Sequence, residues 1–222
     1  MRSALMPTGQ DEPRPERPGW DHVRRRELRT GDVQLWWLPL GAGGSPVVRA
    51  SGRLYEVLAS WREQREPLSL YHSALRVVVD DVAFVIEVTP AWSRPSPDAC
   101  SIAGTGAVGA RPFGSSQWFR YEIRRWPGGV IPDQQHAVAG PQHLSSDPDR
   151  ALLLLALAGQ CPTFVWGRDQ LRTGEMWNSN SVVAWLLSRA GLEAGGPPPG
   201  GRAPGWGAGL ELARRQRERE RW

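Results

Sequence analysis

The sequence predicts an α+β fold in which a small antiparallel sheet packs against helices. Two apolar segments rich in β-branched residues, 70–79 and 82–89, are joined by Asp80-Asp81, which is typical of a β-hairpin. Residues 182–190 carry Val, Leu and Ala at helical spacing and are followed by Gly191, a common helix terminator. With 222 residues, of which 40% are hydrophobic, the chain is long enough to form a core without disulfide support.

Before the hairpin, the pattern predicts a strand and then a helix. Residues 33–38 favour a strand because a glycine-rich turn signal follows them at 41–44. Residues 51–61 place apolar side chains at positions i, i+3, i+4 and i+7, so they favour a helix that Ser51 caps. After the hairpin, residues 93–116 are rich in Ser, Gly, Ala and Pro, and we expect a long loop there.

The second half of the chain predicts two strands and a helix before the helix at 182–190. Residues 118–126 alternate aromatic or apolar residues with Arg and Glu, which indicates a half-buried strand. Ser146 or Asp147 is expected to cap a leucine-rich helix that stops at Gly159. Residues 163–166 favour a short strand.

Composition shifts divide the chain into four parts. Residues 1–28 are rich in Pro, Arg and Glu and are expected to be a disordered tail. Residues 29–194 form the predicted domain, and 195–205 are a Gly/Pro-rich linker. Residues 206–222 are expected to hold one more strand, at 209–214, followed by an Arg/Glu-rich tail.

The protein is basic, with 27 arginines, no lysine and a net charge of +4. The arginine bias suggests the codon usage of a GC-rich, bacterial genome. Arginines concentrate at 24–26 and 214–221, which favours solvated tails and leaves nucleic-acid binding as an alternative. Two cysteines indicate neither a disulfide framework nor a metal site, and no cofactor is expected. Without an apolar leader or a membrane-span pattern, a cytoplasmic protein is expected.

One polar motif stands at the start of the last strong helix. Asn178 or Asn180 can accept a hydrogen bond from a free backbone N–H there, so the motif is typical of a helix N-terminus. Ser179 lies in the first turn, where the helix dipole and neighbouring amides favour a developing negative charge. Chemically, Ser179 is a candidate nucleophile, and a plain helix cap is the alternative.

A histidine at the start of the hairpin is the candidate base. If Asp80-Asp81 is a two-residue turn, His72 and Glu87 share one face of the sheet, with the small Ala74 between them. Glu87 would then orient the imidazole of His72, as the acid does in a catalytic triad. A three-residue turn would place Glu87 on the opposite face, and an ion pair of Glu87 with an arginine such as Arg76 is the alternative.

Together, segments 71–77 and 178–183 resemble the circularly permuted branch of the papain-like, NlpC-type peptidase superfamily, which includes PPPDE peptidases and lecithin retinol acyltransferase-like proteins. The resemblance covers roughly 32–192. It is also seen with bacterial proteins whose motif is Asn-Ser-Asn followed by Ser or Thr. It implies a papain-like fold with the His strand first and the nucleophile helix late. Ser179 takes the position of the family cysteine, His72 that of the base, and Glu87 the third polar position.

The replacement of cysteine by Ser179 decides between two functions. A serine hydroxyl is neither ionised nor strongly nucleophilic at neutral pH, so we expect a catalytically impaired domain that binds a peptide or glycan. The alternative is a serine hydrolase or acyltransferase of amide, ester or isopeptide bonds. In that case Asn178 and Asn180 would line the oxyanion site. Trp166 and Trp177 flank the approach to the helix, where they would form a cleft wall or pack in the core.

Overall fold

The computed structural model describes residues 30–41, 64, 66–92, 100–131 and 134–221. In this part of the chain, seven strands form one sheet in the order β4-β5-β3-β2-β1-β6, with β7 beside β2. Neighbouring strands are antiparallel except for β2 and β7, which are parallel. The strands are β1 (Gly31–Pro39), β2 (Ser69–Val79), β3 (Val82–Pro90), β4 (Ser101–Ala107), β5 (Arg120–Pro127), β6 (Gln142–Ser145) and β7 (Gly201–Arg202).

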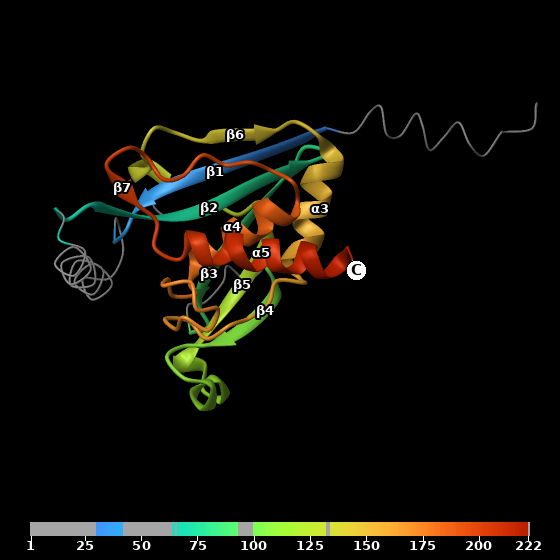
Figure 1. Ribbon diagram of the computed structural model, residues 1–222. Coiled ribbons are helices and arrows are strands. Elements are labelled where there is room, and N and C mark those ends of the chain that lie inside the picture. Colours follow the sequence, from blue (N-terminus) through green and yellow to red (C-terminus); the bar gives the residue numbers. More distant parts are fainter. Residues whose placement is uncertain (1–29, 42–63, 65, 93–99, 132–133, 222) are drawn as a thin grey trace, which may run out of the picture.

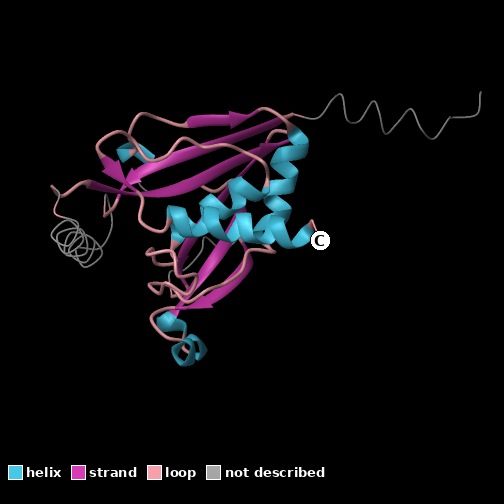
Figure 2. Ribbon diagram, viewed as in Figure 1, coloured by secondary structure: helices cyan, strands magenta, loops and turns pink. Residues whose placement is uncertain are grey.

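The α-helices of the described residues gather on one side of this sheet, as Figures 1 and 2 show. Their buried residues form one cluster with residues of β1, β2, β3 and β5. The predicted α+β class is therefore confirmed. The helices are α3 (Pro148–Ala158), α4 (Ser179–Arg189), α5 (Trp206–Glu220) and the 3₁₀ helices η1 (Arg111–Ser115), η2 (Gln117–Phe119) and η3 (Gln134–His136).

The sheet has two different faces, because successive side chains of a strand point to opposite sides. The helix face of β2 carries Tyr71, Leu75 and Val77, which belong to the core beneath the α-helices. The outer face carries Ala74, which packs in a smaller cluster with Trp36, Leu38, Val85 and Ile131. This assignment of faces decides which predicted site residues can meet.

The hairpin between β2 and β3 forms in the predicted register. Val79 pairs with Val82, so the turn has two residues. Asp80 and Asp81 have φ values of 49° and 65°, which is the backbone of a type I′ turn. The paired register extends only to Leu75 and Ile86. Beyond that point β2 stays paired with β1 while β3 stays paired with β5, so the two strands separate.

The expected loop at 93–116 was wrong in its second half, where β4 forms. Small residues here serve close packing and do not signal a loop. A side chain at Gly106 would lie 2.4 Å from the ring of Tyr121 on β5, so glycine lets this ring lie against the strand. The pattern SIAGTGA therefore looked like a loop although it is a sheet edge.

The strand expected at 118–126 forms as β5, but its charged face is not solvated. Tyr121 and Ile123 lie in the main core, as predicted. Glu122 and Arg124 on the outer face are also buried, and the Arg124 guanidinium donates to the Glu122 carboxylate at 2.9–3.0 Å. Phe119 is exposed and belongs to η2. Glu122 and Arg124 can be buried because their opposite charges neutralise each other, which the alternation of residue types in the sequence did not predict.

The helices expected to end at Gly159 and at residue 190 are confirmed with small shifts. Asp147 caps α3 by accepting from the amide of Asp149, and the helix ends at Gly159. Gly191 follows α4 with a φ of 67°, the left-handed conformation that glycine favours. The strand expected at 163–166 is reduced to a single bridge between Trp166 and Val108.

The expected C-terminal strand at 209–214 was wrong, because these residues belong to α5. This helix runs beside α4, and Gly209 fits against Ser181, where an added Cβ would lie 2.1 Å from the Ser181 carbonyl oxygen. The arginine-rich run continues the helix through i, i+3 and i, i+4 ion pairs such as Glu211–Arg214. The 195–205 segment is not a simple linker either, because it contains β7 and the buried Ala203, Pro204 and Gly205.

Two predictions lie outside the described residues. They are the disordered tail at 1–28 and the helix at 51–61, and residues 93–99 of the expected loop at 93–116 lie outside them too. Among the helices that the structure describes, none has the length and apolar character needed to cross a membrane.

Candidate functional site

The candidate motif begins α4 and is capped as the sequence predicted. The Asn178 side chain accepts hydrogen bonds from the amides of Asn180 and Ser181 at 2.9 and 3.4 Å. The Ser181 hydroxyl accepts from the Asn178 amide at 3.1 Å, which completes a capping box. Ser181 also donates to the Gly205 carbonyl at 2.8 Å. The cap therefore fixes the start of α4 and the approach to α5 together.

Asn180 connects this helix to the start of β2. Its side-chain oxygen accepts from the amide and hydroxyl of Ser73 at 2.8 and 2.9 Å. Its side-chain nitrogen donates to the carbonyls of Tyr71 and Pro204, both at 3.0 Å. Asn180 is only 3% exposed, so these hydrogen bonds satisfy its amide within the protein. The motifs 71–77 and 178–183 thus meet in space, and Asn180 joins them.

The same contact separates the candidate base from the candidate nucleophile. Ser73 points toward α4, because its hydroxyl binds Asn180. His72 must then point to the outer face, where its partner across β1 is Leu38 of the smaller cluster. Ser179 lies in the first turn of α4, on the helix face. Within the described residues, no hydrogen bond joins the Ser179 hydroxyl to His72.

Glu87 shares the outer face with His72, as the two-residue turn predicted. Its neighbours Val85 and Ile86 belong to the outer and helix clusters respectively, so alternation puts Glu87 on the outer side. Glu87 lies opposite Arg124 in the β3–β5 register. Burial raises the pKa of the Glu87 carboxyl, and the positive charge of Arg124 partly offsets this. The arginine that lies opposite Glu87 is thus Arg124 on β5, while Arg76, which the alternative named, lies 4.0 Å from Asp32.

The aromatic candidates contribute mainly to packing. Trp177 is 1% exposed, and its ring packs at a tilt against that of Phe164, with the ring centroids 5.1 Å apart. Its indole N–H donates to the Tyr121 hydroxyl at 3.2 Å. Tyr121 in turn donates to the Phe164 carbonyl. Trp166 is half-buried and lies 5.4 Å from the Tyr121 ring. The buried Trp177 presents no open surface to a ligand, so of its two expected roles it takes packing in the core.

The two cysteines do not supply an alternative thiolate. Cys161 is buried, and burial raises the pKa of its thiol. Burial also raises the pKa of the Cys100 thiol, beside the charges of Arg124, Glu87 and Glu122. A thiol with a raised pKa stays protonated at neutral pH and is a poor nucleophile.

An open hollow lies beside the start of α5, where the sequence predicted no site residue. Its volume is about 320 Å³. The lining consists of polar or charged side chains and one glycine, from the 167–177 loop and from α5: Arg172, Thr173, Glu175, Gly207, Glu211 and Arg215. Ligand pockets usually span about 300–1,000 Å³, so this hollow suits a small polar group.

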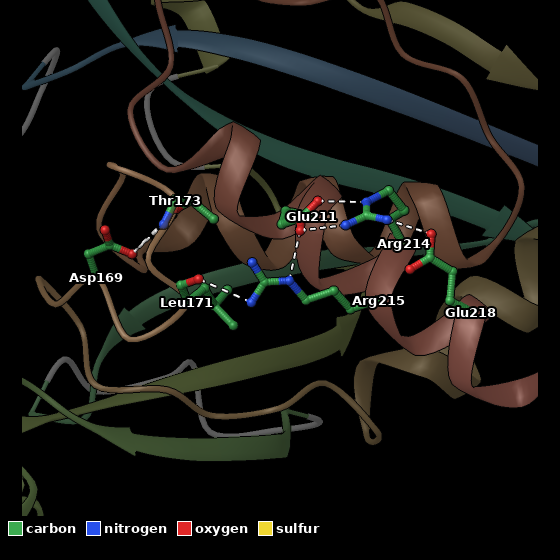
Figure 3. A network of polar contacts seen from close by, with 7 residues as sticks. All are labelled: Asp169, Leu171, Thr173, Glu211, Arg214, Arg215 and Glu218. Atoms are coloured by element: carbon green, nitrogen blue, oxygen red, sulfur yellow. Dashed lines mark hydrogen bonds and ion pairs between the residues drawn. The ribbon is translucent and has the colours of Figure 1, made fainter.

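Internal hydrogen bonds hold both walls of the hollow, as Figure 3 shows. On the loop, Asp169 accepts from the amides of Thr173 and Gly174 at 2.9 and 2.8 Å, and the Thr173 bond is the main cause that lowers the pKa of Asp169. On α5, Arg215 donates to Glu211 at 2.7 Å and to the Leu171 carbonyl at 3.1 Å. The helix is thereby fastened to the loop.

The free cationic group at this hollow is Arg172. Its side chain is exposed, its φ is 56°, and no ion pair with another described residue holds its guanidinium. Glu175, by contrast, caps α5 by accepting from the Gly207 amide at 2.9 Å. Nearby on the same loop, Arg168 donates to the Gly109 carbonyl. From the sequence, α5 could have been recognised by the spacing of Glu211 with Arg214 and Arg215, because residues at i, i+3 and i, i+4 form ion pairs along a helix.

In the described part of the chain, no group of three or more His, Cys, Asp or Glu side chains is placed to hold a metal ion. Comparison of the chain with protein-family models, with curated proteins and with solved structures gave no match.

Proposed function

We propose that the chain is a circularly permuted papain-like domain that binds a peptide or glycan and does not catalyse a serine-dependent reaction. The observation that carries the proposal is the set of hydrogen bonds made by Asn180. They support the permuted arrangement, because they dock the late helix α4 on the early strand β2. They also turn Ser73 toward the helix and leave His72 on the outer face.

The separation of Ser179 and His72 argues against the hydrolase alternative. A serine hydroxyl depends on a base within hydrogen-bond reach to become nucleophilic. Strand alternation puts the His72 side chain on the outer face of the sheet, while Ser179 belongs to α4, which packs on the other face. The buried, fully bonded amide of Asn180 further indicates that this motif stabilises the fold.

The hollow beside α5 is the surface that we assign to the ligand. Peptides and glycans offer hydroxyl, amide and carboxylate groups, which match a lining of Thr173, Glu175 and two arginines. Arg172 can bind a ligand carboxylate in the paired geometry that guanidinium groups favour. Arg215 keeps its place through Glu211 and Leu171, so the hollow is preorganised on that side.

Nucleic-acid binding is disfavoured by the way the arginines of α5 are used. Arg214 and Arg215 bind Glu211, and Glu218 accepts from Arg214. On the neighbouring helix, Arg189 binds Glu220. Carboxylates therefore neutralise much of the basic run, while a nucleic-acid surface needs arginines that can reach phosphates.

The catalytic part of the proposal is tested by covalent labelling. Wild-type protein and Ser179→Ala are treated with a serine-directed fluorophosphonate, and the adduct is measured by intact mass spectrometry. We expect no adduct that depends on Ser179. A wild-type adduct that disappears in Ser179→Ala would overturn the non-catalytic assignment and restore the hydrolase.

The binding part is tested with arrays of short acidic peptides and of oligosaccharides, followed by titration of the strongest ligand. Arg172→Ala should weaken this binding by roughly tenfold, the loss expected for one charge-assisted contact. Arg219→Ala is the matched control, because Arg219 is exposed near the end of α5 and away from the hollow. Equal loss in both variants would indicate unspecific charge attraction and reject this site.

A further inference from the structure

The exposed aromatic side chains of the described residues gather at one end of the molecule. They are Trp92 after β3 and Phe113, Trp118 and Phe119 in η1 and η2, with exposed fractions of 52%, 53%, 66% and 49%. The Ala91 amide donates to the Arg120 carbonyl at 2.8 Å, which brings Trp92 beside the start of β5. We call these four residues the aromatic tip.

The aromatic tip projects away from the core. Figures 1 and 2 show η1 and η2 at the end of the β4–β5 arm, beyond the α-helices. Its base is fixed, because the Val108 amide donates to the Phe119 carbonyl and the Gly109 amide to the Trp166 carbonyl. The tip therefore protrudes from the rest of the domain.

The tip holds its exposed side chains in a defined arrangement. The Phe113 and Phe119 rings are 5.3 Å apart. The Ser116 amide donates to the Phe113 carbonyl at 3.0 Å, and the Ser116 hydroxyl accepts from the Trp118 amide at 3.4 Å. Exposing such a cluster to water is unfavourable, and clustered exposure on a monomer marks an interaction surface.

The charge around the tip is positive. Between Cys100 and Tyr121 the sequence contains Arg111 and Arg120 but no Asp or Glu. Arg111 is exposed and Arg120 is half-buried. At the base of the tip, the exposed Arg168 binds the Gly109 carbonyl, but the exposed carboxylate of Asp169 follows it, so the positive charge of the tip comes from Arg111 and Arg120. A partner with negative charge and an apolar interior would complement this surface.

We propose that the aromatic tip docks the protein on the surface of an anionic lipid bilayer. Trp and Phe are suited to the boundary between headgroups and acyl chains, and arginines attract anionic headgroups. The side chains of a protruding tip can insert into this boundary, which needs no complementary groove on the partner. This contact is peripheral and uses none of the residues that line the hollow beside α5. It rests on the proposed function only in placing ligand binding at a membrane surface.

The test is co-sedimentation of the intact chain with vesicles of phosphatidylglycerol and phosphatidylcholine, compared with vesicles of phosphatidylcholine alone. We expect binding to the anionic vesicles and little to the neutral ones. The double variant Trp118→Ala, Phe119→Ala should lower the vesicle affinity by roughly tenfold or more. The matched control is Leu153→Ala, Leu210→Ala, which removes two exposed apolar side chains from α3 and α5.

A second variant and a second measurement keep the outcome clear. Arg111→Gln changes an exposed residue and should weaken binding to anionic vesicles alone. Circular dichroism verifies that each variant is folded. The proposal is overturned if the wild-type protein does not bind anionic vesicles, or if the tip variant and the control variant bind them with equal affinity. It is also overturned if light scattering shows that the tip variant loses self-association while vesicle binding stays unchanged, because the tip would then contact a second copy.

Discussion

The N-terminal ends of α4 and α5 lie side by side but are built in different ways. At α4, Asn178 caps the helix from its own sequence, and the buried Asn180 fastens it to β2. At α5, Gly205 has a φ of 87° and provides no side-chain cap, so Glu175 from the preceding loop binds the Gly207 amide. The start of α4 is therefore packed against other parts of the protein, while the start of α5 borders the open hollow.

This difference separates residues that build the fold from residues that can meet a ligand. A Cβ at Gly205 would lie within 2.6–2.7 Å of polar atoms of Asn178, Met176 and Ser181, so the α4 cap and the α5 start are packed against each other. The polar groups at the start of α4 thus form hydrogen bonds within the protein. Around the hollow, polar groups of Arg172 and Thr173 are at the surface. A polar motif at a helix start is therefore no sufficient sign of chemistry.

The largest effect is expected from Asn180→Ala, which removes the connection between α4 and β2. The variant leaves the Ser73 amide and the Tyr71 carbonyl without their partner in a buried place. We expect the free energy of unfolding to fall by about 3 kcal/mol or more. Equilibrium unfolding in urea, followed by circular dichroism, measures the change.

Ser179→Ala is the control for this prediction, because it changes the adjacent residue of the same turn. Its effect on the free energy of unfolding should stay within about 0.5 kcal/mol. If Ser179→Ala were as damaging as Asn180→Ala, the division between a structural Asn180 and a structurally neutral Ser179 would be wrong.

A medium effect is expected where α5 packs on α4. In Gly209→Ala the new Cβ would lie 2.1 Å from the Ser181 carbonyl oxygen and 2.9 Å from the Ala184 Cβ. Because backbone must move, we expect a loss of about 1–3 kcal/mol in unfolding free energy in spite of the better helix propensity of alanine. Thermal and urea unfolding of the variant measure it.

Gly207→Ala is the matched change on the same helix, two residues earlier. Its new Cβ would meet the Glu175 carboxylate at 3.0 Å, and the end of a side chain can move aside. Its cost should therefore be clearly smaller than that of Gly209→Ala. The opposite order would mean that the start of α5 is as tightly closed as that of α4.

The sequence predicts the elements whose signals are local. The type I′ hairpin at Asp80-Asp81, the Asp147 cap and the Gly191 terminator all rest on backbone preferences of a few neighbouring residues. The Asn178 cap at the candidate site belongs to the same class. These predictions were confirmed because no distant contact competes with them.

Features that depend on distant partners were not predictable. Gly106 looked like a loop residue, since nothing in the sequence shows that the Tyr121 ring needs its space. Residues 209–214 looked like a strand, although Ser181 and Ala184 on α4 decide that a helix packs there. Likewise, the pairing of His72 with Ser179 was inferred from motif order, while the Asn180–Ser73 contact determines where these side chains point.

The smallest effect concerns the charged wall of the hollow and depends on pH. Hydrogen bonds from Arg214 and Arg215 lower the pKa of Glu211 from an ordinary value of 4.5 to about 2. A carboxyl whose folded pKa is lowered stabilises the fold above its unfolded pKa, and this contribution is lost as the pH falls from about 4.5 toward 2. Glu211→Gln should therefore lower Tm slightly at neutral pH, and the Tm difference from wild type should shrink on acidification. Thermal unfolding between neutral and acidic pH measures this difference, and high salt should reduce it because Glu211 lies at the surface. If the Tm difference changed with neither pH nor salt, the charge of the Glu211 carboxylate would not help to hold α5 to the loop. Arg215 would then keep its position through the Leu171 carbonyl alone.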